Sequence, residues 1–323
     1  MYVEYKSMLK SKRINACIFI CSISLVLFTA CESNRPSEQS FEQPVKSMTQ
    51  DLKAASPENS QETGSLDTNT AEIPVESLII ADGQTVAERF DVLQGFTRLE
   101  SEEDSFAYYL QNLPLKPEGA KVKYYDGREK MRDVYLAVVD FSLGERDLQQ
   151  CADAVIRLRA EYLYAMERFD EIHFNFVSGF NAEFSKWADG KGISVSGSEV
   201  SWNTNSNNNS SYESFQKYLD IVYAYASTLS LEKELVEKPL PDLAIGDVFI
   251  QGGSPGHCVI VVDMAVKENT GEKIFMLAQS YMPAQDIQIL EGDSEGSPWF
   301  SASMEDILKT PEWTFQVSDL KTW

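Results

Sequence analysis

The sequence is poor in histidine, and most of its cysteines lie near its start. Only His173 and His257 occur among 323 residues, so one chain cannot supply a metal site built from several histidines. Three of the five cysteines fall within the first 31 residues. Cys151 and Cys258 remain for the rest of the chain, which excludes a disulfide framework. We expect no metal and no cofactor.

Basic residues are also scarce. The chain has 28 Lys and Arg against 50 Asp and Glu, which gives a formal net charge of -22. Such a charge repels a phosphate backbone, so we expect no nucleic-acid partner. The hydrophobic share of 43% and the charged share of 24% are those of an ordinary globular protein, which excludes a wholly disordered chain.

The start of the chain has the layout of a bacterial export signal. Basic residues between positions 6 and 13 precede an apolar run over 17–28, which is too short to span a bilayer comfortably. The ending LFTAC over 27–31 resembles a lipobox, which implies that residues 1–30 are a signal peptide and that Cys31 carries a lipid. An uncleaved anchor, or a secretory peptide in which Cys31 is incidental, is the alternative. We expect a lipid-anchored protein of the bacterial cell envelope, with the outer membrane favoured.

Residues 31–72 are dominated by Ser, Glu, Gln, Asn, Thr and Pro. Such a segment cannot bury enough apolar surface to offset its ordering entropy, so we expect a disordered tether. Residues 73–323 have ordinary globular composition and are long enough for one domain with a sizeable core.

Apolar periodicity predicts two long helices, over residues 148–168 and 212–234. The strands expected after them cover 247–251, 258–264 and 274–279, with glycine-containing turns between. Helices followed by antiparallel strands predict an α+β fold.

Cys151 is the candidate nucleophile. Asp147 and Gln150 fit a capping box with Asp147 as N-cap, so Cys151 is expected in the first helical turn, where a thiol pKa falls. His257 opens a strand after a glycine-rich turn. Gln279 ends the next strand, where its amide can bind the imidazole and fix the tautomer.

The same residues also have structural explanations. Cys151 lies on the apolar stripe of its helix, and buried cysteines are common. A single histidine at a strand start is often structural. Cys258 directly follows His257, so alternation predicts that its side chain points to the opposite face, in the core. His173 is expected to be exposed.

The strings GDVF at 246–249, GHCVIVV at 256–262 and AQSY at 278–281 resemble the second half of papain-like cell-wall amidases of the NlpC and CHAP groups. The resemblance implies a papain-like α+β domain that hydrolyses amide bonds in peptidoglycan peptides. It implies Cys151 as nucleophile, His257 as general base and acid, and Gln279 as the orienting residue. From position 151 to position 257 the gap is 106 residues, so we expect a long insertion that folds away from the site.

A wider resemblance covers nearly the whole body. The strings LQQCADAVIRLRAEYLY, IGDVFIQGGSPGH and LAQSYMPAQDIQIL are similar to domain of unknown function 4846, a family of Bacteroidota lipoproteins that carries no activity to transfer. The resemblance to the cell-wall amidases is the basis for our prediction of a thiol amidase or peptidase that acts on peptidoglycan or other envelope peptides. The alternative is a non-catalytic envelope lipoprotein that uses the same fold as a binding module.

Overall fold

The computed structural model describes residues 77–204 and 206–323. The predicted signal peptide, the lipidation residue Cys31 and the predicted tether all lie outside the described residues, as do the first four residues of the predicted domain. No helix within the described ranges is long and apolar enough to cross a bilayer.

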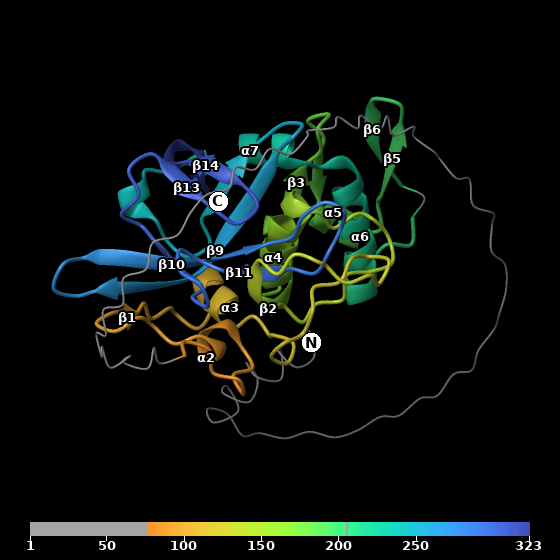
Figure 1. The fold of residues 1–323 in the computed structure, drawn as a ribbon. Helices are drawn as coiled ribbons and strands as arrows, with labels where there is room; N and C mark the ends of the chain where they lie inside the picture. Colours follow the sequence, from red (N-terminus) through yellow and green to blue (C-terminus); the bar gives the residue numbers. More distant parts are fainter. Residues whose placement is uncertain (1–76, 205) are drawn as a thin grey trace, which may run out of the picture. The chain divides into compact units, whose positions relative to one another are not determined.

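The main sheet has nine strands, and the pairings within it are antiparallel. Its strands are β1 (Thr97–Arg98), β2 (Tyr135–Val138), β7 (Val236–Glu237), β8 (Val248–Gln251), β9 (His257–Lys267), β10 (Glu272–Gln279), β11 (Gln288–Leu290), β12 (Trp299–Ser301) and β15 (Leu320–Thr322). The strand order is β2-β11-β10-β9-β8-β15-β7, with β1 beside β9 and β12 beside β10. The hairpin of β9 and β10 therefore lies at the centre of the sheet (Figure 1). This mixed architecture confirms the predicted α+β class and its antiparallel sheet.

Strand β9 is buried over most of its length because both faces of the sheet are covered. Cys258 and Ile260 face a large core that the sheet shares with the helices. Val259 and Val261 alternate onto the other face, where a smaller core includes Phe315. A strand with two buried faces has a continuous apolar run, which is why this strand could be predicted from the sequence.

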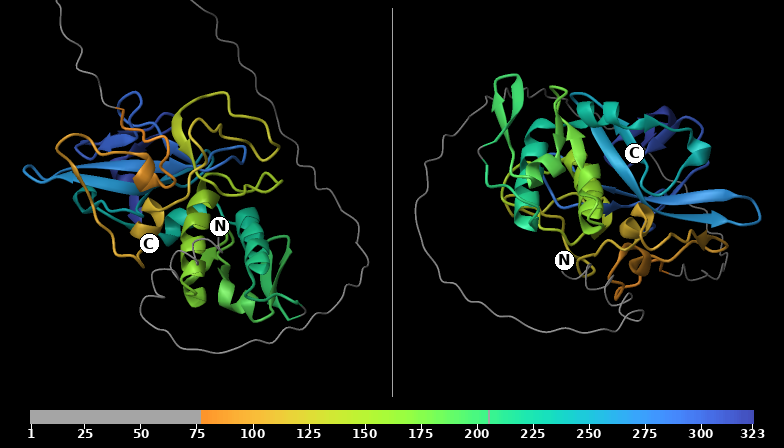
Figure 2. Two further views of the ribbon diagram at one scale, coloured as in Figure 1. Left: turned by 90° about the horizontal axis from the view of Figure 1, so that it is seen from below. Right: turned by 180° about the vertical axis from the view of Figure 1, so that it is seen from behind.

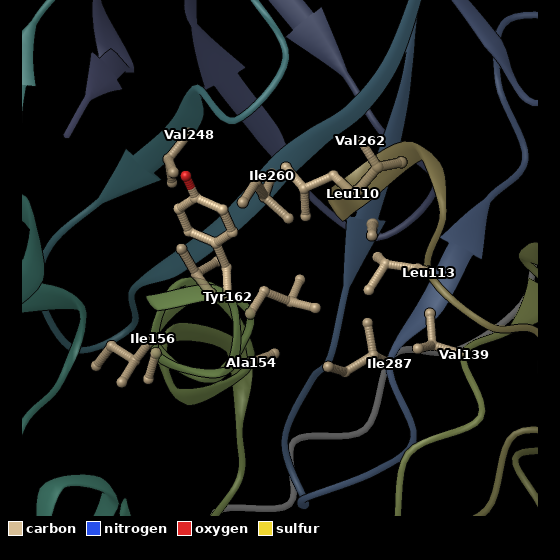
Figure 3. Packing of buried hydrophobic residues seen from close by; sticks show 14 of the residues in the cluster. Leu110, Leu113, Val139, Ala154, Ile156, Tyr162, Val248, Ile260, Val262 and Ile287 are labelled. Carbon is tan, nitrogen blue, oxygen red and sulfur yellow. The ribbon is translucent and has the colours of Figure 1, made fainter. Parts of the chain in front are cut away.

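The helices are α2 (Val86–Arg89), α3 (Phe106–Gln111), α4 (Cys151–Ala165), α5 (Phe184–Ala188), α6 (Tyr212–Tyr225) and α7 (Thr228–Glu234), with short 3-10 turns at Phe169–Glu171, Leu240–Asp242 and Val317–Asp319. Helix α4 is the central one, and almost all its residues are buried. Figure 3 shows its residue Tyr162 beside Ile260 of β9 and Val248 of β8.

The chain between α4 and β8 packs on α4 instead of forming a separate unit. It contains α5, α6, α7, β7 and two small hairpins, β3 (His173–Asn175) with β4 (Asn181–Glu183) and β5 (Gly192–Ser196) with β6 (Glu199–Asn203). Helix α6 lies beside α4 (Figure 2). The rings of Phe215 and Tyr164 stack there with centroids 4.3 Å apart, and Tyr212 donates a hydrogen bond of 2.8 Å to Glu161.

The predicted start of the first long helix was wrong. Helix α4 begins at Cys151 with Gln150 as N-cap, three residues later than the predicted Asp147 cap. The Asp147 carboxylate instead accepts a hydrogen bond from the backbone N–H of Ala284, 137 residues away, at 2.7 Å. Asp153 supplies the local cap, because it accepts from the backbone N–H of Gln150 at 3.1 Å.

The second predicted long helix is two helices. Helix α6 ends at Tyr225, and Ser227 begins α7 by accepting a hydrogen bond from the backbone N–H of Leu229 at 3.1 Å. A serine side chain competes with helical hydrogen bonds in this way, so it favours a cap over a helix interior.

Candidate active site

The fold brings the three predicted site residues to one place. Cys151 is the first residue of α4, His257 is the first residue of β9, and Gln279 is the last residue of β10. Since β9 and β10 are antiparallel neighbours, the start of β9 and the end of β10 lie at the same end of the strand pair. The Nε2 atom of His257 is 2.8 Å from Oε1 of Gln279.

Cys151 lies in a setting that favours its thiolate form. The residue is 8% exposed, and its thiol donates a long hydrogen bond of 4.0 Å to the carbonyl oxygen of Gly256, a contact that by itself favours the protonated form. The pKa of Cys151 falls from its ordinary 9.0 to about 5. A hydrogen bond from the Cys258 thiol is the largest cause; burial opposes it, and His257 and the backbone N–H of Ala152 add to the lowering.

Cys258 has a role that the sequence did not reveal. Its side chain enters the core on the face opposite that of Val259, as alternation predicted. Because α4 covers that same face, the Cys258 thiol meets Cys151 at the start of the helix. Burial raises the pKa of Cys258 well above its ordinary value, and the hydrogen bond to Cys151 adds to this. Cys258 is therefore the less acidic thiol of the pair, and Cys151 is the more acidic one.

Aromatic rings enclose the imidazole of His257, which is 1% exposed. The ring centroid of Tyr281 lies 4.7 Å from that of His257, Trp313 lies at 5.4 Å, and Phe315 lies at 5.9 Å in a stacked arrangement. Gln279 binds one ring nitrogen, so Nδ1 is the nitrogen left for Cys151. The packing restricts rotation of the imidazole and shields its hydrogen bonds from water.

Two charged residues behind Gln279 were missed by sequence reasoning. The Nε2 atom of Gln279 donates to the carboxylate of Glu312 at 2.6 Å. Lys130 donates to the same carboxylate oxygen, also at 2.6 Å, and both side chains are largely buried. Glu312 and Lys130 lie in loops far from the strand motifs, and no sequence pattern links them to the site.

Asp153 is a buried carboxylate in the first turn of the nucleophile helix. Its Oδ2 atom accepts the capping hydrogen bond, whereas its Oδ1 atom is buried without a hydrogen-bond partner. Burial raises the pKa of Asp153 well above its ordinary value, and the charge of Cys151 raises it further.

His173 is not part of this cluster. It is exposed, as predicted, and its Nδ1 atom lies 3.3 Å from the carboxylate of Glu234. That hydrogen bond raises the pKa of His173. Across residues 77–204 and 206–323, no group of three or more histidine, cysteine or acidic residues is arranged to hold a metal ion.

The chain matches a known protein family over most of its length. The model of the family described as Domain of unknown function (4846) matches residues 86–322, which span α2 to β15 and include Cys151, His257 and Gln279. No curated protein and no solved structure matches the chain.

Proposed function

We propose that this chain, which belongs to the family described as Domain of unknown function (4846), is a thiol amidase or peptidase with Cys151 as its nucleophile. Peptidoglycan peptides or other peptides of the cell envelope are the proposed substrates. The observation that carries the proposal is the thiol of Cys151, whose pKa is lowered to about 5 beside a histidine that Gln279 holds at 2.8 Å.

A papain-like arrangement is the proposed fold type. Such a fold joins a helix that begins with the nucleophile to an antiparallel sheet that supplies the histidine and its orienting residue. The contact between α4 and β9, and the neighbouring β9 and β10 strands, support this assignment.

The proposed reaction is acyl transfer to the thiolate. The Sγ atom of Cys151 attacks the carbonyl carbon of the amide, and the carbonyl oxygen becomes negatively charged. The backbone N–H of Cys151 is at the first helical position, has no helical acceptor, and can stabilise that oxygen. His257 then gives its proton to the leaving amine, which departs and leaves a thioester.

Water completes the cycle. His257, now neutral, accepts a proton from the water, whose oxygen attacks the thioester carbon. The carboxylic acid leaves, and the sulfur returns to its thiolate form beside the protonated imidazole. Gln279 accepts from Nε2 of His257 throughout, so Nδ1 remains the nitrogen that exchanges the proton.

A non-catalytic binding module is the second candidate, and one observation favours it. Cys151 is 8% exposed and His257 is 1% exposed, so little of either side chain is open to a substrate in this conformation. An enzyme of this arrangement needs Tyr281 or a neighbouring segment to move before a peptide can reach the sulfur.

Selective alkylation tests the proposal. Iodoacetamide is expected to modify Cys151 in the folded protein at pH 6, where a free thiol with a pKa of about 8.5 is protonated. Cys151→Ser is expected to abolish hydrolysis of peptidoglycan stem peptides, His257→Ala to lower it by about 10²-fold or more, and the control His173→Ala to leave it unchanged. A native Cys151 that reacts only after unfolding, together with no hydrolysis, would favour the binding module.

A further inference from the structure

We infer that Glu312 is a positioning residue, which holds the Gln279 amide in the orientation that makes His257 present Nδ1 to Cys151. The inference rests on the proposed function, because Glu312 acts on the thiol only through Gln279 and His257. Neither the strand motifs nor the family match assigns a role to Glu312.

The inference rests on a series of hydrogen bonds that runs from His257 through Gln279 to Glu312 and Lys130. The Nε2 atom of His257 lies 2.8 Å from Oε1 of Gln279. The Nε2 atom of Gln279 donates to Glu312 at 2.6 Å, and Lys130 donates to the same Glu312 oxygen at 2.6 Å. Each of these side chains is buried or nearly so. Buried polar groups of this kind exchange few hydrogen bonds with water, so their donors and acceptors must match one another.

The donor and acceptor chemistry then decides the tautomer. An ionised carboxylate only accepts hydrogen bonds, so the nitrogen of the Gln279 amide must face Glu312. The amide oxygen must consequently face His257, and because it only accepts, His257 must carry its hydrogen on Nε2. A glutamine with no such neighbour can turn its amide over and accommodate either tautomer.

Lys130 is the charged partner of Glu312. Their side chains are 3% and 11% exposed, so bulk solvent screens the pair only weakly. Burial lowers the pKa of Lys130, while the hydrogen bond to Glu312 acts against that lowering. Removing Lys130 would leave the Glu312 carboxylate buried without its charged partner.

The hairpin that carries Glu312 also contacts the imidazole of His257 directly. Glu312 lies between β13 (Ile307–Lys309) and β14 (Thr314–Gln316). The next residue, Trp313, lies over His257, and its indole N–H donates to Gln251 at 2.9 Å. Gln251 is the residue that pairs with His257 between β8 and β9. One hairpin therefore fixes the ring position and, through Glu312, the ring tautomer.

Nitrogen-15 NMR of the imidazoles gives a direct test. The sequence has only two histidines, so the signals of His257 are assigned with a His173→Gln variant. In a Cys151→Ser background at pH 9, where imidazole side chains are neutral, the expected spectrum is a single tautomer with hydrogen on Nε2. Adding Glu312→Gln is expected to give both tautomers in comparable amounts, because an amide at position 312 can accept or donate.

A charge swap provides the rescue. Gln279→Glu combined with Glu312→Gln puts the carboxylate next to His257, with an amide behind it that donates to the carboxylate and accepts from Lys130. This double variant is expected to restore the single tautomer. With Cys151 present, Glu312→Gln is expected to raise the midpoint of the pH profile of alkylation by about one unit, and the double variant to reverse that shift.

The matched control is Asp263→Asn. Asp263 is a buried, ion-paired carboxylate on the same strand as His257, with Arg98 at 2.8 Å. It is expected to change neither the tautomer nor the midpoint, and an equal shift in this control would overturn the inference. So would an unchanged tautomer in Glu312→Gln.

The double variant covers the case in which Glu312→Gln alone does not fold. A folded double variant with one tautomer then supports the inference, and an unfolded double variant or a mixed tautomer overturns it. The tautomer readout requires no reactivity of Cys151. An unreactive wild-type thiol with the expected tautomer response would therefore reject the proposed function and leave the role of Glu312 standing.

Discussion

The thiol of Cys258 lies beside the sulfur of Cys151, and this neighbour is the largest single cause of the lowered pKa of Cys151. The two cysteines lie on elements that are distant in sequence, α4 and β9, which meet in the main core. A thiol that serves as a weak donor thus stands where a backbone N–H or a cation is more usual.

Replacing Cys258 tests that relationship. Cys258→Ala removes this weak donor, so the pKa of Cys151 is expected to rise by about one unit. Iodoacetamide alkylation measured from pH 4 to pH 9 gives the midpoint, which is expected near 5 in the wild type. Cys258→Ser keeps a donor and is expected to shift the midpoint less; a midpoint unchanged in Cys258→Ala contradicts the assignment.

Asp153→Asn is expected to stabilise the protein increasingly as the pH rises. Burial raises the folded-state pKa of Asp153 above its unfolded value of about 3.9. Below pH 4 both states hold the proton, whereas above it the unfolded state ionises first, so wild-type stability is lost as the pH rises. The free energy of unfolding is measured with urea at pH 4 and pH 8, and the gain of the variant over the wild type is expected to be larger at pH 8. The exposed control Asp82→Asn should show no such difference between the two pH values.

Tyr281 is expected to limit access to the sulfur. Its ring lies 4.7 Å from the imidazole of His257, and the charge of Cys151 contributes to the raised pKa of Tyr281 after burial and the charge of Glu312. Tyr281→Ala should therefore speed alkylation of Cys151 by a bulky maleimide several-fold more than alkylation by iodoacetamide. Tyr225→Ala, which removes a partly exposed tyrosine ring from α6, is the control and should leave the ratio of the two rates unchanged.

Cys31→Ser tests the proposed lipid anchor. If Cys31 is acylated, wild-type protein is expected in the membrane fraction without residues 1–30, and the variant should appear as soluble or uncleaved precursor. Mass spectrometry of the N-terminus and fractionation measure both, with Cys21→Ser as the control. Membrane binding that persists in Cys31→Ser, with residues 1–30 retained, would indicate an uncleaved anchor instead.

Local sequence patterns were enough to predict the central strands of the sheet and which of them carry His257 and Gln279. Apolar runs bounded by glycine turns gave β8, β9 and β10, because a strand buried on both faces needs apolar side chains at consecutive positions. The helix start failed for a non-local reason: Asp147 binds Ala284 across the fold, so its carboxylate is not free to cap α4. A capping pattern in the sequence shows which side chain is able to cap a helix, but it does not show which hydrogen-bond partner that side chain has in the folded protein.

The sequence by itself determined the α+β class, the antiparallel sheet, and the placement of Cys151 in the first turn of a helix and of His257 at the start of a strand. These features depend on the spacing of apolar residues and turn residues along a short stretch of chain. Only the tertiary structure decided that Cys258 lowers the pKa of Cys151 and that Glu312, with Lys130, orients Gln279. Those contacts join segments that are far apart in the chain. Hydrogen bonds between them require distances of a few ångströms, and these distances are set by the packing of α4 and of the β13–β14 hairpin on the sheet.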